Sequence, residues 1–568
     1  MLKGIAASSG VVLAKAYKLE QPVLDITKKE SDPAVEIERF HTSLTDTKKD
    51  ILIIQEKAKG RLTDEELAIF DAHMMVCDDP EFTGQIEEIM NADKVNADYA
   101  VNEVGNMFIT MFESMDDPYF RERAADIKDV TFRIKCHLLN KVIPDLSLIN
   151  EETIIVANDL TPSDTAQLNK QFTKGFATAI GGRTSHSAIM ARSLEIPAVV
   201  GIQGIMESVN HNDFIILDAL DGVVIVNPDD KQIQEYTKKA ERFHDLKMSL
   251  KVMKDAESVT TDGHHVELVG NIGKPNDAES VLTNGGEGVG LYRTEFLYMD
   301  AQALPTEEEQ FVAYSKVLEK MGKRPVVIRT LDIGGDKELA YLPFPKEMNP
   351  FLGYRAIRLC LDRKDIFKTQ VRALLRASVF GKLCIMFPMI ATLDEFREAK
   401  TFVLDEKAVM IKEGIKVSDD FQIGMMVEIP AAAVLADQFA KEADFLSIGT
   451  NDLIQYSMAA DRMSEKVAYL YQPYNPSLLR LIKMTIEGAH KEGKWVGMCG
   501  EMAGEELAVP VLLGLGLDEF SMSASSILQA RKMVRSLSYA EMKVLAAEAL
   551  TKGTNAEVVE LIKKSLNK

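Results

Sequence analysis

The sequence predicts a multidomain α/β protein: an α/β domain that contains an inserted helical domain, followed by a C-terminal (β/α)8 TIM barrel. The chain has 568 residues, of which 46% are hydrophobic, enough for about three domains with packed cores. The pattern changes along the chain from short apolar runs to helical spacing and back again, which indicates an insertion. The second half contains eight short apolar runs, the number of strands in a (β/α)8 barrel.

Residues 1–20 and 145–230 are predicted to form one α/β domain. Between them, residues 21–144 are predicted to form the helical domain, because apolar residues such as Ile37, Phe40 and Leu44 recur at a spacing of three to four with charges between them. In the α/β domain, apolar runs bounded by turn residues indicate strands at 3–19, 153–156, 175–179, 198–201, 214–218 and 222–227.

Residues 231–260 are predicted to be a linker helix, and residues 261–568 the barrel. The stretch from Glu235 to Lys254 is highly charged and has helical spacing. The segments between the barrel runs are mostly long enough for one helix each. The eight predicted barrel strands lie at 266–270, 287–291, 325–329, 383–388, 422–428, 444–449, 495–499 and 517–522.

One histidine stands on a glycine-hinged turn at the predicted start of a helix. Gly181 and Gly182 allow backbone conformations closed to other residues, and Thr184 or Ser185 is a natural N-cap. A phosphate on His186 would face backbone N–H groups and the positive end of the helix dipole. The alternative is a capping or core histidine, but the residues just before His186 are polar and glycine-rich. The pattern therefore predicts a phosphorylatable nucleophile.

Polar residues follow five of the predicted barrel strands. Because barrel active sites lie at the carboxyl ends of the strands, these side chains are expected at one rim. A thiol there is either buried and inert or a proton donor to a developing enolate. The strand-end residues are Arg293, Arg329, Glu428, Asn451 with Asp452, and Cys499.

The same residues predict a site for a metal and an anionic ligand. Glu428 and Asp452 offer the hard oxygens that suit Mg²⁺, although a salt-bridged pair is the alternative. Arg293, Arg329 and Arg462 offer forked donors for phosphate and carboxylate, although each taken alone could be a surface residue. Three arginines and Mg²⁺ would outweigh two carboxylates, so a ligand with a phosphate and a carboxylate would balance the pocket.

The composition excludes several classes of partner. A net charge of −21 argues against nucleic acid, which is bound through clustered Lys and Arg. No apolar run approaches the ~18 residues that span a bilayer, and the amino terminus lacks the apolar core of a signal peptide, so we expect no membrane insertion. The five cysteines include no C-x-x-C pair, which argues against a disulfide framework or a zinc site. We therefore expect a cytoplasmic protein.

Two stretches carry a resemblance to a known family. Residues 181–192, GGRTSHSAIMAR, are similar to a phosphohistidine signature, and residues 444–456, DFLSIGTNDLIQY, to a second signature in a barrel. The chain resembles, from end to end, enzyme I of the bacterial phosphoenolpyruvate:sugar phosphotransferase system. The first signature is shared in looser form with pyruvate phosphate dikinase and phosphoenolpyruvate synthase, which carry a large ATP-binding domain that has no counterpart here.

The resemblance implies a swivelling α/β phosphohistidine domain and a barrel that binds phosphoenolpyruvate and releases pyruvate. His186 matches the family's phosphorylated histidine and Cys499 its proton donor. Glu428 and Asp452 match its Mg²⁺ ligands. The positions that match its phosphoenolpyruvate-binding residues are Arg293, Arg329, Asn451, Asp452 and Arg462.

The resemblance also implies two protein partners. The helical domain would dock the small phosphocarrier protein HPr, and the barrel would form a homodimer. Residues 64–93 hold ten acidic residues and no Lys or Arg, and Met74, Met75 and Phe82 could add adaptable apolar contacts. A solvated acidic face is the alternative.

Three other functions stay open at this point. A dikinase-type enzyme would phosphorylate His186 from ATP. A regulatory binding protein would use the acidic helical domain only to capture a partner. A barrel lyase would use Mg²⁺ and an enolate, but the domain that carries His186 would then have no purpose.

Overall fold

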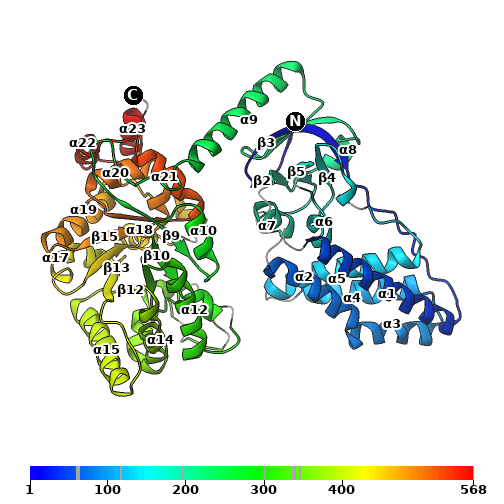
Figure 1. Cartoon of the computed structure of the whole chain (residues 1–568), viewed down its shortest axis with the longest axis horizontal. Coiled ribbons are helices and arrows are strands. Elements are labelled where there is room, and N and C mark those ends of the chain that lie inside the picture. The colour runs from blue at the N-terminus through cyan, green and yellow to red at the C-terminus, as the bar shows by residue number, and fades with distance from the viewer. Residues whose placement is uncertain are drawn as a thin grey trace. The chain divides into compact units, whose positions relative to one another are not determined.

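The computed structural model describes residues 1–58, 64–114, 118–144, 146–169, 171–182, 185–193, 196–299, 301–335, 337, 339, 341–344, 347–462 and 464–566. The chain divides into two compact units, Met1–Leu246 and Lys247–Lys568. Figure 1 labels many of the elements of each unit.

The first unit contains an eight-stranded sheet whose strands come from both ends of its sequence. The strand order is β1-β8-β7-β3-β4-β5-β6-β2. Neighbours from β3 to β6 are parallel, and the outer pairs are antiparallel. The strands are β1 (Leu2–Lys3), β2 (Ile5–Ser8), β3 (Val11–Lys18), β4 (Thr153–Ala157), β5 (Thr173–Thr178), β6 (Ala198–Val200), β7 (Phe214–Asp218) and β8 (Val223–Val226).

Short helices connect strands β4 to β7 of this sheet. They are α6 (Pro162–Ala166), α7 (His186–Ser193) and α8 (Ile205–Ser208). Two buried clusters pack with the sheet: one includes Phe176 and Met190, the other Ile154 and Ile205. The sheet is therefore covered by apolar residues of its own connections.

Five helices form a block between β3 and β4 in the sequence, and Figure 1 shows them lying alongside one another. Their shared core includes Phe40, Ile51, Phe70, Val101 and Val130. The helical spacing of these residues in the sequence explains why they face one another. The helices are α1 (Pro33–Ala58), α2 (Asp64–Asp78), α3 (Pro80–Asp93), α4 (Ala97–Glu113) and α5 (Pro118–Leu138).

A long, charged helix, α9 (Asp230–Lys251), leads from the first unit to the second and has no buried residue. The second unit is a closed barrel of parallel strands in the order β10-β11-β12-β13-β14-β15-β16-β9. The predicted fold class is thus confirmed. The strands are β9 (Glu267–Ile272), β10 (Val289–Arg293), β11 (Pro325–Arg329), β12 (Lys382–Phe387), β13 (Gln422–Val427), β14 (Phe445–Ile448), β15 (Trp495–Met498) and β16 (Glu519–Met522).

Helices surround the barrel strands in sequence order. They are α10 (Asp277–Thr283), α11 (Glu295–Met299), α12 (Glu307–Met321), α13 (Ile357–Asp362), α14 (Lys364–Ala377), α15 (Leu393–Lys412), α16 (Pro430–Val434), α17 (Ala436–Phe439), α18 (Thr450–Met458), α19 (Pro476–Lys491), α20 (Ala508–Leu515), α21 (Ile527–Val534), α22 (Tyr539–Ala549) and α23 (Asn555–Leu566).

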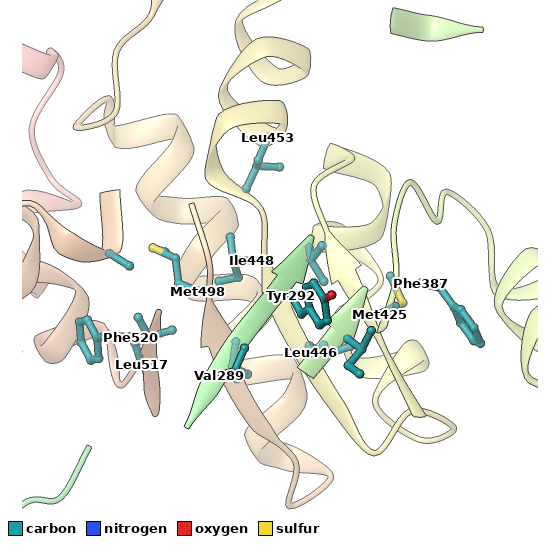
Figure 2. Packing of buried hydrophobic residues seen from close by; sticks show 14 of the residues in the cluster. Val289, Tyr292, Phe387, Met425, Leu446, Ile448, Leu453, Met498, Leu517 and Phe520 are labelled. Carbon is teal, nitrogen blue, oxygen red and sulfur yellow. The ribbon is translucent and has the colours of Figure 1, made fainter. Parts of the chain in front are cut away.

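Alternate residues of each strand face the helices or the barrel interior. The outward residues join one large core, of which Figure 2 shows Val289, Tyr292, Met425, Ile448 and Phe520. The inward residues form a separate cluster inside the barrel: Leu291, Val327, Cys384, Met386, Met426, Phe445 and Cys499, with Trp495 packed against it. This alternation decides which side chains can reach a site at either end of the barrel.

Candidate active site

The barrel residues that the sequence analysis selected line one cavity of about 660 Å³. The cavity lies where the barrel strands end. It is lined by Arg293, Arg329, Glu428, Asn451, Asp452, Arg462 and Cys499, together with Glu295, Asp332, Lys337, Tyr471 and Glu501. The prediction that strand-end residues gather at one rim is confirmed as geometry, whereas their chemical roles stay predictions.

Strand alternation explains why these side chains meet. Leu291 and Val327 belong to the inner cluster, and Arg293 and Arg329 stand two residues further along the same strands, so they face the same side. Glu428 stands two residues after Met426, which also points inward. The strands that build the barrel core thus also aim their last polar residue into the cavity.

Arg329 is held by carboxylates in a buried position. Its guanidinium Nη2 donates to Glu295 Oε1 at 2.6 Å and lies 3.0 Å from Asp332 Oδ2. Lys337 Nζ donates to the same Glu295 oxygen at 2.9 Å. Burial raises the pKa of Glu295, but Arg329 and Lys337 outweigh that effect and hold the pKa below its ordinary value. Glu295 is therefore ionised and fixes both cations at the cavity wall.

A second cation, Arg355, lies beneath the site with only 1% of its surface exposed. Its Nη2 donates to Asp332 Oδ1 at 2.8 Å and lies 3.8 Å from Asp452 Oδ2. Arg462 Nη1 lies 3.6 Å from the other oxygen of Asp452. Asp452 is thus placed between two guanidinium groups at the start of α18.

Asn451 shares the first turn of α18, and Tyr471 donates to its Oδ1 at 3.1 Å. Gly500 allows this helix start to come close to the loop after β15, because an added Cβ would lie 1.7 Å from Thr450 Oγ1. Any side chain at this glycine would push α18 away from the cavity.

Glu428 and Asp452 form a buried carboxylate pair. Glu428 Oε1 accepts from the backbone N–H of Met389 at 2.6 Å, and Met389 has a positive φ of 57°. Burial, followed by the charge of Asp452, raises the pKa of Glu428 to about 8. Asp452 Oδ1 is a buried oxygen with no hydrogen-bond partner. A divalent cation would relieve this repulsion and satisfy that oxygen, so the pair fits a Mg²⁺ ion that takes its remaining ligands from water and substrate.

Among the described residues, no group of three or more His, Cys, Asp or Glu side chains is arranged to hold a metal ion by itself. A metal at Glu428 and Asp452 would therefore depend on ligands that arrive with the substrate or the solvent.

Cys499 is buried beside the carboxylate pair. Its Sγ lies 3.8 Å from the carbonyl of Ile448, to which it donates. Burial raises the pKa of the Cys499 thiol to about 11. The thiol therefore keeps its proton near neutral pH and is available as an acid rather than as a nucleophile.

Sequence reasoning missed five residues of the cavity and its support. Glu295 follows Arg293 by two residues and Asp332 follows Arg329 by three, so a wider window after each strand would have found them. Lys337 and Arg355 belong to the long segment between β11 and α13, where no periodicity marks them. Tyr471 likewise follows a short 3₁₀ segment.

These residues also change the predicted charge balance. The described lining holds four cationic side chains and five carboxylates. With Mg²⁺ this lining would carry a formal charge of +1, which is less than the +3 given by the three arginines, the metal and the two carboxylates of the sequence analysis. The cationic groups are paired with carboxylates that hold them in position.

His186 is the first residue of α7 in the first unit. Gly181 has a positive φ of 115°, as the glycine hinge predicts. Ser185 caps the helix, since its Oγ accepts from the backbone N–H of Ala188 at 3.4 Å. The same hydroxyl donates to Gly182 O at 2.8 Å. Arg183, Thr184 and the side chain of His186 lie outside the described residues. The backbone turn and helix start predicted for His186 are present.

The acidic stretch of the helical block is only partly as expected. Met75 is 71% exposed, whereas Phe82 is 1% exposed and packs in the core against Phe108. The prediction that Phe82 offers a contact surface is therefore wrong. Met74 is partly buried against the same core. Several acids are also paired, for example Asp78 with Lys48 and Asp93 with Lys28.

A groove of about 600 Å³ lies beside Met75 in the helical block. Its lining combines apolar side chains with carboxylates. The residues are Ala72, Met75, Val76, Asp78, Asp79, Pro80, Phe112, Arg123, Asp126 and Ile127.

The helices of the described part of the chain include none that is long and apolar enough to cross a membrane. All five cysteines are free and buried.

Three family profiles match the chain, and their descriptions refer to PEP-utilising enzymes. The PEP-binding domain matches residues 247–539. The N-terminal domain matches residues 3–123, and the mobile domain matches residues 149–222. The first match covers more than half of the chain.

Curated relatives match the chain over its whole length, and each is named phosphoenolpyruvate-protein phosphotransferase. The protein of Priestia megaterium is 58% identical over 100% of this chain and 99% of its own length. The protein of Listeria monocytogenes is 60% identical over 99% of both chains. The protein of Bacillus subtilis is 58% identical over 99% of both chains.

Proposed function

The chain belongs to the phosphoenolpyruvate-protein phosphotransferase family of the phosphotransferase system, and we propose that it phosphorylates His186 from phosphoenolpyruvate and then passes the phosphoryl group to HPr. As a member of this family it is an enzyme that uses phosphoenolpyruvate. The observation that carries the proposal is the cavity in which paired arginines, two carboxylates and a protonated thiol converge.

Phosphoenolpyruvate would bind in this cavity through its two anionic groups. Arg293 and Arg329 would hold the phosphate, because forked guanidinium groups match phosphate oxygens. Arg462 and Asn451 would hold the carboxylate end. The ion pair between Arg329 and Glu295 at 2.6 Å supports this assignment, since it fixes the guanidinium before the substrate arrives.

The metal ion of the site would be Mg²⁺, held by Glu428 and Asp452. When bound, it would neutralise charge that develops on the phosphoryl oxygens. The absence of a hydrogen bond to Asp452 Oδ1 and the raised pKa of Glu428 support a cation at the two carboxylates.

The transfer step would break the bond between phosphorus and the enol oxygen and form a bond between phosphorus and a ring nitrogen of His186. Arg293 and Arg329 would stabilise the equatorial oxygens of a loose transition state. The enolate that departs would take a proton from the thiol of Cys499 and leave as pyruvate. The buried, protonated state of this thiol supports its role as the acid.

His186 belongs to the first unit and the cavity to the second, so the two must meet for transfer and separate for delivery. HPr would receive the phosphoryl group at the helical block. The groove beside Met75 supports this docking site, because it joins an exposed, adaptable methionine to carboxylates such as Asp78 and Asp79.

Two further proposals concern the oligomeric state of the protein and its location in the cell. We infer that the barrel forms a homodimer and that the enzyme works in the cytoplasm, where its five reduced thiols would persist. No role in nucleic-acid binding is proposed, because the net charge is −21.

A test of the proposal uses labelled phosphoenolpyruvate with wild-type protein, His186→Ala and Asp452→Asn. The His186→Ala variant should bind phosphoenolpyruvate but take up no acid-labile phosphate. The Asp452→Asn variant should lose Mg²⁺-dependent labelling while keeping an intact fold. Acid-labile label on His186→Ala would contradict the assignment. Labelling from ATP without phosphoenolpyruvate would favour the dikinase-type alternative.

A further inference from the structure

The barrel has a second cavity, of about 660 Å³, at the amino ends of its strands. It lies at the opposite end of the strands from the candidate active site. Residues from six strand starts line it: Glu267 of β9, Pro325 of β11, Lys382 and Cys384 of β12, Gln422 of β13, Trp495 of β15 and Glu519 of β16. None of these residues takes part in the chemistry proposed above.

The strand alternation that builds the active site also builds this cavity. Gln422 stands six residues before Glu428 on the same side of its strand, and Trp495 stands four residues before Cys499. Cys384 and Trp495 pack with the cluster inside the barrel. The cavity is therefore the opening of the barrel interior at the amino ends of the strands, and not a depression on the outer surface.

Glu519 contributes a buried carboxyl group to this cavity, and the hydrogen-bonding capacity of that group is not satisfied. Its residue is 2% exposed, and its Oε1 has no hydrogen-bond partner. The carboxyl group lies close to Gly497, where an added Cβ would be 2.7 Å from that oxygen. An unpaired buried oxygen is costly. Burial, followed by the charges of Glu267 and Asp518, raises the pKa of Glu519 to about 8.

The rest of the lining is acidic. Glu287 pairs with Arg531 at 3.7 Å, and Asp518 with His490 at 2.8 Å, so these two acids are partly neutralised. The lining residues that carry or can carry charge are Glu267, Glu287, Asp420, Asp518 and Glu519 on one side and His265 and Lys382 on the other. The excess of carboxylates favours a cationic occupant.

The cavity suits an organic cation better than a metal ion. The described residues contain no group of three or more metal-ligating side chains with suitable spacing. A volume of about 660 Å³ lies in the range of small-molecule sites. Trp495 adds an aromatic surface, and Gln422 Oε1 accepts from its Nε1 at 3.3 Å, which fixes the indole.

We propose that this cavity binds a short-chain organic amine, with one primary ammonium group on Glu519 Oε1 and the carbon chain along Trp495. An ammonium group donates up to three hydrogen bonds, and Glu519 Oε1 would accept one of them. Gln422 Oε1 already accepts from Trp495 Nε1 and from Cys384 Sγ, so it positions the indole and does not bind the amine. A second ammonium group would reach the carboxylates at the mouth, so a linear diamine is the matched ligand.

Trp495 makes the test direct, because it is the only tryptophan in the chain. Titration of the full-length protein with putrescine should change the tryptophan fluorescence saturably. Glu519→Gln should weaken binding at least about tenfold, because a charge-assisted hydrogen bond becomes a neutral one. Asp420→Asn, at an exposed position of the same lining, should change affinity less than about threefold. Pyruvate formation from phosphoenolpyruvate should stay unchanged in both variants.

Proton release gives a readout that needs no variant. Since the amine would bind the ionised form of Glu519, putrescine should release close to one proton at pH 7, and its affinity should rise between about pH 6 and pH 8. Calorimetry in two buffers of different ionisation enthalpy measures this. The groups that could share the release are His265, Glu267, Glu287, Lys382, Cys384, Asp420, His490 and Asp518. Loss of the release in Glu519→Gln would assign it to Glu519.

Four results would overturn the proposal. They are the absence of saturable binding at millimolar putrescine, equal affinity in Glu519→Gln, equal competition by Mg²⁺ or by sodium at matched ionic strength, and displacement by phosphoenolpyruvate. The last would locate the amine at the other end of the barrel. If Glu519→Gln does not fold, absence of proton release from the wild-type protein would be decisive by itself.

Discussion

At the scale of single residues, the candidate active site depends on where the backbone places charge and burial. Arg329, Glu428 and Cys499 were predictable because each follows a recognisable strand. Lys337 and Arg355 were not, because a long irregular segment brings them back to the strand ends through tertiary contacts alone. Charged residues in such segments leave no periodic signal in a sequence.

Replacing Cys499 by Ala should separate phosphoryl transfer from pyruvate formation. The thiol is the buried acid nearest the proposed enolate, so its loss should slow steady-state pyruvate formation about 10²- to 10⁴-fold. Rapid-quench measurement of acid-labile label should still detect slow phosphorylation of His186. Substrate binding, measured by calorimetry, should change little. Unimpaired turnover would remove Cys499 from the mechanism.

Asp164 should give the first unit a measurable pH dependence. Burial, followed by the charge of Asp129, raises the pKa of Asp164 to about 6, above the unfolded value of about 3.9. The folded form therefore binds more protons between these values, and its stability falls as the pH rises from about 4 to about 6. The difference between these two pKa values corresponds to a loss of roughly 3 kcal/mol in the free energy of unfolding.

The Asp164→Asn variant should lose this contribution and gain stability, relative to wild type, as the pH rises from 4 to 7. The amide can still accept the capping hydrogen bonds that Asp164 receives from Thr161. Urea unfolding at several pH values measures the difference. Glu88→Gln, at an exposed position, is the matched control, and its free energy of unfolding should depend on pH in the same way as that of the wild-type protein. Parallel curves for Asp164→Asn and wild type would contradict the assignment.

At the scale of elements, the strands of the barrel were the most predictable part of the chain. Each of the eight apolar runs overlaps one observed strand, and the ends differ by a few residues at most. Buried parallel strands read as short apolar runs, because both of their faces are covered. Phe82 was misassigned because only one face of a surface helix is buried, and the sequence alone did not show which face. The cap Asp79 and Pro80 start α3 at a position that places Phe82 on the buried face.

Arg531 of α21 fixes the segment that follows α9 to the barrel and should be essential to that connection. Its buried guanidinium donates to the carbonyls of Met253, Lys254 and Gly285 at 3.1, 2.9 and 2.6 Å. Arg531→Met would leave the carbonyls of Lys254 and Gly285 without these donors, so the free energy of unfolding of the second unit should fall by about 3–5 kcal/mol.

The neighbouring Arg535 provides the control for this prediction. It is exposed and donates to the carbonyl of Glu257 at 2.8 Å, so Arg535→Met should cost less than about 1 kcal/mol. Urea unfolding followed by the fluorescence of Trp495, which lies in the second unit, measures both variants. Equal losses would show that the connection does not depend on the buried guanidinium.

At the scale of the whole molecule, the two units should unfold as separate transitions. The substrate cavity belongs to the second unit alone, so phosphoenolpyruvate with Mg²⁺ should raise the midpoint of one transition only. At a ligand concentration about 100 times its Kd, the gain is about 2.7 kcal/mol. Differential scanning calorimetry of the full-length His186→Ala variant measures it, because this variant should bind phosphoenolpyruvate without being phosphorylated in the first unit. A single transition, or a shift of both, would contradict this division.

The central claim is that His186 carries phosphate from phosphoenolpyruvate to HPr. The most direct measurement incubates the pure protein with Mg²⁺ and phosphoenolpyruvate labelled in its phosphate, maps the modified residue, and then adds HPr. The account predicts acid-labile label on His186 alone, one pyruvate per label, and transfer of the label to HPr. Label at another residue, or label on His186 that HPr cannot remove, would contradict it.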